Sequence, residues 1–273
     1  MLKSFIFRFR QAAKVKKLKY HTFTVYQSYL LLLLLFLFST KTFFAQEYVE
    51  AHAIPMPGIS YSFQIPGGDM AKRFGNNSNI GAHFTFKTKN NWIFSAEGIF
   101  MFGDKVKEPI LDSLKSSNGE IINEFGEYAR VVLSERGLFF AGSIGRLIPV
   151  WGPNKNSGIL ITAGAGFLQH KIRIETEGNN VPALFGDYSK GYDRLSNGFA
   201  LKQFVGYLYL GKRKLYNFFI GVEFWQAFTQ CRRDYNFDMM KKDETLRKDF
   251  LYSFKFGWIL PIYIQQTQKY YTH

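Results

Sequence analysis

The sequence predicts an all-β protein, an eight-stranded antiparallel up-and-down β-barrel that crosses a membrane with its strands and carries long extracellular loops. Three features lead to this fold class. Segments of about 8–12 residues alternate between apolar and polar side chains, and the connections between them alternate between long and short. Within the segments, aromatic side chains are concentrated at every second position, which is one face of a strand. Aromatic residues make up 18% of the 273-residue chain and hydrophobic residues 47%, a composition that excludes a disordered polymer.

The positive charge of the chain is concentrated at its N-terminus. The formal net charge of +14 comes from 35 basic and 21 acidic residues. Residues 1–45 contain eight of the basic residues and no acidic one, so the remainder carries only +6, from 27 basic against 21 acidic residues. The excess therefore belongs to the N-terminal segment, and we expect no nucleic-acid partner.

Residues 1–45 have the plan of a signal peptide. A basic stretch precedes the apolar run YLLLLLLFLF at 29–38, and a polar exit leads to Ala45. This run is too short for a comfortable transmembrane helix, which needs about 20 residues. We predict cleavage after Ala45, a mature chain that begins at Gln46, and export to an oxidising compartment, where the single cysteine rules out a disulfide scaffold.

The mature chain, 46–273, reads as one barrel domain with strands within about 57–264. Residues 59–65 give the cleanest case, with apolar side chains at odd positions and polar ones at even positions. Seven further segments follow the same plan. They lie within residues 80–87, 92–102, 137–147, 158–170, 198–210, 218–229 and 252–262.

The connections between these segments indicate the cellular setting. Three are short: residues 88–91, 148–157 and 211–217. The other four are long: residues 66–78, 103–136, 171–197 and 231–249. Short periplasmic turns and long outer loops are typical of barrels in the bacterial outer membrane. We therefore expect extracellular loops and periplasmic termini.

A soluble barrel would turn inward the alternate strand positions that carry aromatic side chains. The small interior volume of an eight-stranded barrel argues against this arrangement. The interior of eight strands is only just filled by ordinary side chains, so it cannot hold this many rings. We therefore predict that the rings face lipid and that the glycine-rich, polar parity lines the lumen. The rings in question are Trp92, Phe94, Phe100, Phe102, Phe218, Phe224, Tyr252, Phe254, Phe256 and Trp258.

Paired charges on the predicted inward face indicate a filled lumen rather than a pore. In adjacent antiparallel strands, opposed residues have numbers with a constant sum, which places His83 opposite Glu97. The same rule makes Glu223 and Lys255 near neighbours across the last loop. A buried charge without a partner is expensive, so such pairing is what a dry lumen requires.

No catalytic motif is present in the sequence. It contains no G-x-S-x-G, no H-E-x-x-H and no P-loop. His170, near the outer end of the fifth segment, is expected to be a hydrogen-bonding or capping residue. We expect neither an enzyme nor a bound cofactor or metal.

The long loops are rich in aromatic residues, Arg and Asp, which are common types at protein interfaces. In the third long loop Tyr188, Tyr192 and Arg194 are the candidate docking residues, because Tyr and Arg dominate interface energetics. The alternative is that these loops pack on one another and form a cap over the barrel.

Four loop segments carry a family resemblance: PGGDMAKRFG, QHKIRIE, GDYSKGYDRLSNG and RRDYNFD. Together with the strand plan, they resemble an outer-membrane barrel family of the Bacteroidota, similar to the small OmpX/OmpA-type eight-stranded barrels. This resemblance implies an envelope that contains the barrel assembly machinery, type IX secretion and SusC/SusD-type transporters.

The sequence therefore predicts a non-enzymatic outer-membrane barrel that docks, as an accessory subunit, on a larger outer-membrane complex. Two alternatives remain, a free-standing structural or adhesin-like surface barrel and a lipid A-modifying membrane enzyme. The expected partners are outer-membrane lipid, lipopolysaccharide and other outer-membrane proteins.

Overall fold

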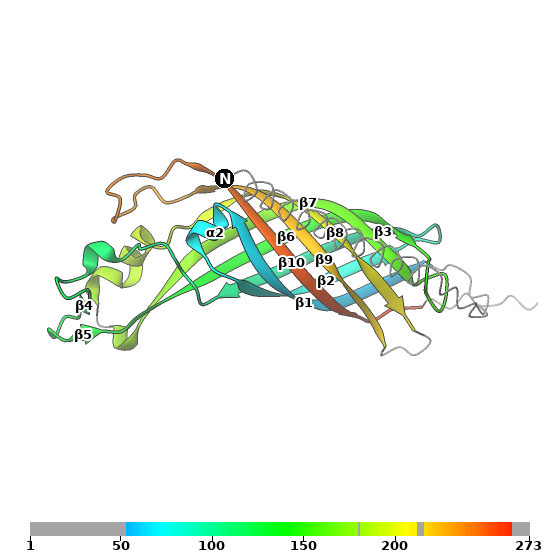
Figure 1. Cartoon of the computed structure of the whole chain (residues 1–273), viewed down its shortest axis with the longest axis horizontal. Helices are drawn as coiled ribbons and strands as arrows, with labels where there is room; N and C mark the ends of the chain where they lie inside the picture. Colours follow the sequence, from blue (N-terminus) through cyan, green and yellow to red (C-terminus); the bar gives the residue numbers. More distant parts are fainter. Residues whose placement is uncertain (1–52, 180, 212–215, 264–273) are drawn as a thin grey trace, which may run out of the picture. The chain divides into compact units, whose positions relative to one another are not determined.

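A computed structural model describes residues 53–179, 181–211 and 216–263 of the chain. The predicted signal peptide, 1–45, and the predicted start of the mature chain at Gln46 lie outside the described residues. Within the described part, eight strands close into one antiparallel barrel in the order β1-β10-β9-β8-β7-β6-β3-β2 (Figure 1). The predicted fold class is confirmed.

Each barrel strand pairs with the barrel strands that precede and follow it in the sequence. The first strand, β1, closes the sheet by pairing with both β2 and β10. Closure leaves no strand edge, so every backbone ladder in the wall has a partner on each side. The strands are β1 (Ile54–Gly68), β2 (Asn77–Lys87), β3 (Trp92–Gly103), β6 (Val131–Ile148), β7 (Gly158–Thr176), β8 (Ser196–Leu210), β9 (Asn217–Cys231) and β10 (Leu246–Ile259).

All eight predicted segments are strands, but several strands are longer than expected. β6 begins at Val131 and β7 continues to Thr176, where these two residues still pair with each other. In β7 the alternation continues through this region, but the outward side chains become polar, with Lys171, Arg173 and Glu175 exposed, so the paired strands extend beyond the apolar outer wall. At the other end β10 stops at Ile259, three residues before the predicted end.

The long connections contain structure that the sequence did not predict. The β1–β2 loop forms the short helix α2 (Met70–Arg73), and the β3–β6 loop contains a hairpin of β4 (Ile121–Ile122) and β5 (Tyr128–Ala129). In Figure 1 this hairpin lies at the far end of the loops, away from the barrel wall. The remaining short elements are 3-10 helices: η1 (Asp112–Leu114), η2 (Glu177–Asn179), η3 (Pro182–Leu184) and η4 (Gly186–Gly191).

The outer wall of the barrel is apolar, as the parity argument predicts. Phe254 is 67% exposed and Phe140 is 59% exposed, although both lie in the middle of paired strands. Other exposed side chains of this wall are Ile59, Tyr61, Phe63, Ile80, Phe84, Phe94, Phe100, Ile144, Phe167, Ile220, Val222, Tyr252 and Phe256. No helix of the described residues is long and apolar enough to cross a membrane.

The lumen is filled by two apolar layers. The layer near the short turns is built around Ile54, Met56, Ile93, Leu160 and Leu208. The larger layer continues from the barrel into the loops. It includes Met70, Phe74, Met101, Ile110, Phe139, Leu168, Ile172, Leu184, Tyr192, Trp225 and Leu251.

Glycines allow the backbones of strands β6 and β7 to approach closely. A Cβ atom at Gly166 would lie 2.1 Å from the backbone oxygen of Phe140, and one at Gly164 would lie 2.2 Å from that of Gly142. Only glycine fits such a distance without a shift of the backbone.

Candidate functional site

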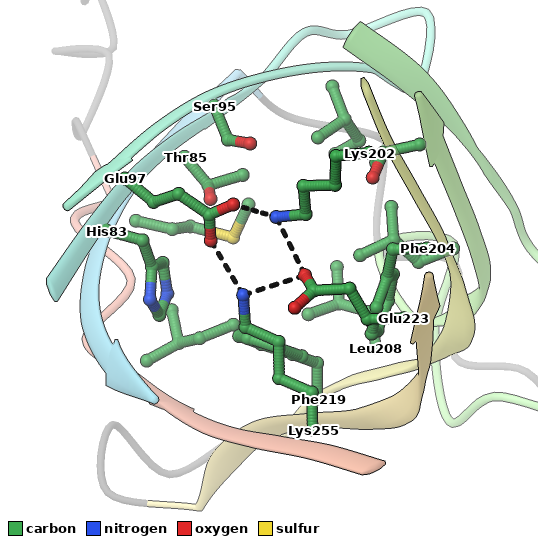
Figure 2. A pocket seen from close by; sticks show the side chains of 15 residues that line it. His83, Thr85, Ser95, Glu97, Lys202, Phe204, Leu208, Phe219, Glu223 and Lys255 are labelled. Carbon is green, nitrogen blue, oxygen red and sulfur yellow. Dashed lines mark hydrogen bonds and ion pairs between the residues drawn. The ribbon is translucent and has the colours of Figure 1, made fainter. Parts of the chain in front are cut away.

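Four charged side chains meet in the lumen between the two apolar layers. Glu97 of β3, Lys202 of β8, Glu223 of β9 and Lys255 of β10 alternate in sign and form a closed ring (Figure 2). Lys255 Nζ lies 2.6 Å from Glu97 Oε2 and 3.0 Å from Glu223 Oε2. Lys202 Nζ lies 2.9 Å from Glu223 Oε2 and also bonds Glu97 Oε1.

The ring is neutral and buried, with side-chain exposures between 0% and 5%. Each cation contacts both anions, so no charge is left without an opposite neighbour. Taking ions out of water is costly, and only such complete pairing offsets that cost. The ring and the two apolar layers therefore fill the lumen across its width, which argues against an open pore.

Glu223 and Lys255 are near neighbours, as predicted, and they form an ion pair, although the two residues do not lie directly opposite each other. Glu223 lies opposite Ser253, and Lys255 lies opposite Gly221. The long lysine side chain spans this offset. The constant sum of opposed residue numbers depends on where the centre of the connecting loop is assumed to lie. The loop between these two strands is long, so its centre is poorly defined by the sequence.

The register predicted for His83 and Glu97 is the observed one. Their side chains form no hydrogen bond, however, because the Glu97 carboxylate is bound by the two lysines. The His83 ring instead meets Phe219 edge to face, with ring centroids 5.2 Å apart. His83 also lies so close to Gly58 that a Cβ at residue 58 would be 2.6 Å from its Nε2.

Lys202 is the ring residue that the sequence argument missed. Two signals could have found it. It stands on the inward, even parity of β8, next to outward Leu201 and Gln203. At the level of the ring, Glu97 and Glu223 with Lys255 alone would also leave one negative charge in a dry lumen, and a second cation would be required there.

A second set of charges ties the four long loops into a cap. Arg73 at the end of α2 donates from Nε to Glu108 Oε2 at 2.5 Å, and Arg194 donates from Nε to Glu108 Oε1 at 3.0 Å. Arg194 also pairs with Asp238. The chain Arg73–Glu108–Arg194–Asp238 takes one residue from each long loop, and we call it the cap chain.

The electrostatics of the cap chain favour ionised Glu108. Burial alone would raise the pKa of the Glu108 carboxyl, but Arg73 and Arg194 outweigh it and hold the pKa below its usual range. Both guanidinium groups are almost fully buried. A second contact supports the cap nearby, where Arg233 donates to both carboxylate oxygens of Asp193.

The three candidate docking residues differ in their exposure to solvent. Tyr188 is 64% exposed on η4. Tyr192 is buried against Phe237, with ring centroids 5.4 Å apart, and Arg194 is buried in the cap chain. Tyr192 and Arg194 therefore occupy the positions that the cap alternative requires, and only Tyr188 is available at the surface.

His170 forms the hydrogen bond expected of it. Its Nε2 lies 3.0 Å from Asp249 Oδ2, which also accepts from Thr229 Oγ1 at 2.5 Å. A histidine paired with an aspartate is a common catalytic arrangement. Here both side chains are 0% exposed, so no substrate could reach the pair without opening the cap.

Comparison with known proteins gives likenesses of fold. No protein-family model and no curated protein sequence matches the chain. Among solved structures, Ail, the attachment invasion locus protein of Yersinia pestis, is 11% identical with a TM-score of 0.39, over 77% of this chain and 99% of that chain. Neisserial surface protein A is 9% identical with a TM-score of 0.41, over 76% of this chain and 96% of that chain.

A major outer membrane protein from Thermus thermophilus is 8% identical with a TM-score of 0.41, over 77% of this chain and 100% of that chain. At such distances the likenesses carry no statement about what this chain binds. The class of the protein follows from its own geometry. A closed eight-stranded barrel with an apolar outer wall and a filled lumen is a small β-barrel of the outer-membrane type.

Proposed function

We propose that the protein is a non-enzymatic barrel of the bacterial outer membrane that docks another outer-membrane protein through its extracellular loops. The exposed apolar wall supports residence in lipid, since soluble proteins rarely expose such a large contiguous apolar surface. The long loops would face outward among lipopolysaccharide, and the short turns and both termini would face the periplasm.

One observation carries the docking part of the proposal. The β4–β5 hairpin presents apolar side chains to solvent beyond the barrel: Ile122 is 48% exposed, Tyr128 is 65% exposed and Phe125 is 73% exposed. Exposed rings outside the membrane are costly in water and are common anchors of protein interfaces. Phe185 and Tyr188 add further exposed rings on the neighbouring β7–β8 loop.

The cap chain gives these anchors a firm base. Glu108 belongs to the same loop as the hairpin and is bound by two buried arginines of other loops. A rigid base lowers the entropy that a docking surface loses on binding. The resemblance of the loop segments to a Bacteroidota family directs the search for a partner to the barrel assembly, type IX secretion and SusC/SusD-type complexes.

A free-standing surface barrel is the second candidate, and a specific observation favours it. Tyr192 and Arg194 turn inward and seal the loops on themselves, which a barrel without a partner would need. The two candidates differ in one respect. Only the docking subunit requires Phe125 and Tyr128 for a stable association.

A pull-down from detergent-solubilised outer membrane tests the proposal. The tagged wild-type protein should retain a larger outer-membrane protein in stoichiometric amount. The double change Phe125→Ser with Tyr128→Ser should abolish this association, whereas Trp151→Ser, an exposed ring in a short turn, should leave it unchanged. A monomeric wild-type barrel in mild detergent would favour the free-standing candidate instead.

A further inference from the structure

One side of the lumen wall is unusually polar, and the proposed docking function does not use it. Ser60, Ser62 and Gln64 of β1 and Asn77 and Asn79 of β2 all face inward and are buried. The strand register sets Ser62 opposite Asn79 and Gln64 opposite Asn77. These side chains therefore form one continuous stripe along the two paired strands.

Most polar atoms of this stripe have no hydrogen-bond partner among the described residues. They are the hydroxyls of Ser60 and Ser62, Gln64 Oε1, Asn77 Oδ1 and both side-chain polar atoms of Asn79. Each of these residues is at most 4% exposed. Buried polar groups without partners are rare, and each one destabilises the fold.

The stripe ends on an ionisable side chain in each direction. Toward the loops, Asn77 Nδ2 donates to Glu135 Oε2 at 2.9 Å, while Glu135 Oε1 has no partner among the described residues. In the other direction Gly58, the next inward residue of β1, lies opposite His83. Both ring nitrogens of His83 are buried and unpartnered within the same part of the chain.

A small cavity adjoins His83 at the charged ring. It has a volume of about 40 Å³, and its polar lining comes from Thr85, Ser95, Thr162, Glu97 and Lys255. Apolar side chains of the lower layer, among them Met56, Ile93 and Leu160, line it toward the short turns. A water molecule needs about 10–15 Å³ of such volume and two to four polar partners. The cavity meets both conditions, and Figure 2 shows Glu97, Lys255 and His83 side by side.

The opposite side of the lumen wall is apolar at the corresponding height. Ala141 of β6, Gly166 and Leu168 of β7 and Ala200 of β8 face inward there and offer no side-chain donor or acceptor. Below the charged ring, the apolar layer built around Ile54 and Met56 closes the lumen toward the short turns.

We propose that β1 and β2 bind a file of ordered water molecules that runs from Glu135 under the cap to His83 at the charged ring. Water satisfies serine hydroxyls, amide groups and imidazole nitrogens alike, which explains why such different side chains share one stripe. The lower apolar layer stops the file.

Water-selective NMR of ¹⁵N-labelled protein in lipid nanodiscs tests this inference. We expect cross-peaks from water to the side-chain amides of Asn77 and Asn79 and to the backbone amide of Ser62. The backbone amides of Ala141 and Leu168, on the dry wall, should show none. Water cross-peaks of equal strength on both walls, or none at Asn79, would overturn the proposal.

A matched pair of serine variants separates bound water from incidental solvent. Ser62→Val removes a hydroxyl without a protein partner among the described residues, so the water cross-peak at Asn79 should be lost or greatly weakened. Ser143→Val removes a hydroxyl that already lies 2.7 Å from Ser95 Oγ, so the Asn79 signal should persist. Equal effects of the two variants would also overturn the proposal. If Ser62→Val does not fold, the contrast between the two walls of the wild-type protein still decides.

Discussion

The charged ring in the lumen and the cap chain in the loops are both networks of four alternating charges, but they are built on different backbones. The ring stands on four strands of one closed sheet, and its two acids are at most 5% exposed. The cap chain joins four loops, and its acids Glu108 and Asp238 are 26% and 15% exposed. The ring is closed, whereas the cap chain has two ends.

The two networks therefore stabilise different parts of the molecule. Ring residues sit in the hydrogen-bonded wall, so breaking their pairing opposes the fold of the barrel itself. Cap residues sit on connections, so breaking theirs releases the loops from one another and leaves the sheet intact. Local opening of this kind is a separate, less costly event than global unfolding.

The largest effect is expected from Glu223→Ala. This change removes one of the two anions that each ring lysine contacts, so Lys202 and Lys255 must share Glu97. We expect the free energy of unfolding, measured with urea in lipid vesicles, to fall by about 3–5 kcal/mol. Glu175→Ala, in an exposed pair with Arg173, is the control and should change it by less than about 1 kcal/mol.

The double change Glu223→Leu with Lys255→Met sharpens this prediction. It leaves the pair of Glu97 and Lys202 intact and neutral. Part of the stability lost in Glu223→Ala should therefore return. Strictly additive losses from the two single changes would show that the residues do not interact.

The second effect concerns the cap chain. Glu108→Ala removes the carboxylate shared by Arg73 and Arg194, and we expect the closed cap to lose about 1–3 kcal/mol relative to the open one. Limited trypsin digestion should cut the β3–β6 loop about 10- to 100-fold faster, while the barrel keeps its compact gel migration. Loss of compact migration in this variant would contradict the division between ring and cap.

The pH dependence of the cap follows from Glu108. Its pKa is lowered in the closed cap because the two guanidinium groups outweigh the effect of burial. A carboxyl with a lowered pKa stabilises the closed state above its ordinary pKa of about 4.3, and this contribution is lost as the pH falls through the lowered value. An acid-stable protease should therefore cut the loops faster as the pH drops below about 4. The variant Glu108→Gln should lose most of this dependence.

Strand register explains how much of the ring could be predicted from the sequence. Alternation fixes which side chains face inward, and it identified Glu97, Glu223 and Lys255 together with His83. Lys202 was missed because its strand is rich in glycine and its alternation is less clean. The offset of Glu223 and Lys255 could not be derived, since a long loop does not fix the register of the strands it joins.

The cap chain could not be predicted in the same way. Its members lie in four loops without a period, and the contacts depend on how those loops fold over the barrel. The residue type of Arg194 predicts a docking residue at the surface, whereas the structure buries it in the cap chain. No local pattern reveals that Glu108 and Asp238 lie within its reach, because that depends on the closure of the whole barrel.

The smallest effect is expected from Asp112→Ala. Asp112 pairs with Lys115 three residues away, and both side chains are largely exposed. The change should alter the free energy of unfolding by no more than about 0.5 kcal/mol and leave trypsin cleavage of the loop nearly unchanged. A loss as large as that of Glu108→Ala would show that any charge removed from this loop opens the cap.

A double-mutant cycle between the two networks tests whether they are separate. Glu223→Gln, Glu108→Gln and the combined variant would be unfolded with urea in the same lipid vesicles. Because the ring and the cap chain share no residue and no partner, the two losses should add, with a coupling below about 0.5 kcal/mol. A coupling above about 1 kcal/mol would mean that ring and cap unfold as one unit, which would contradict the division between them.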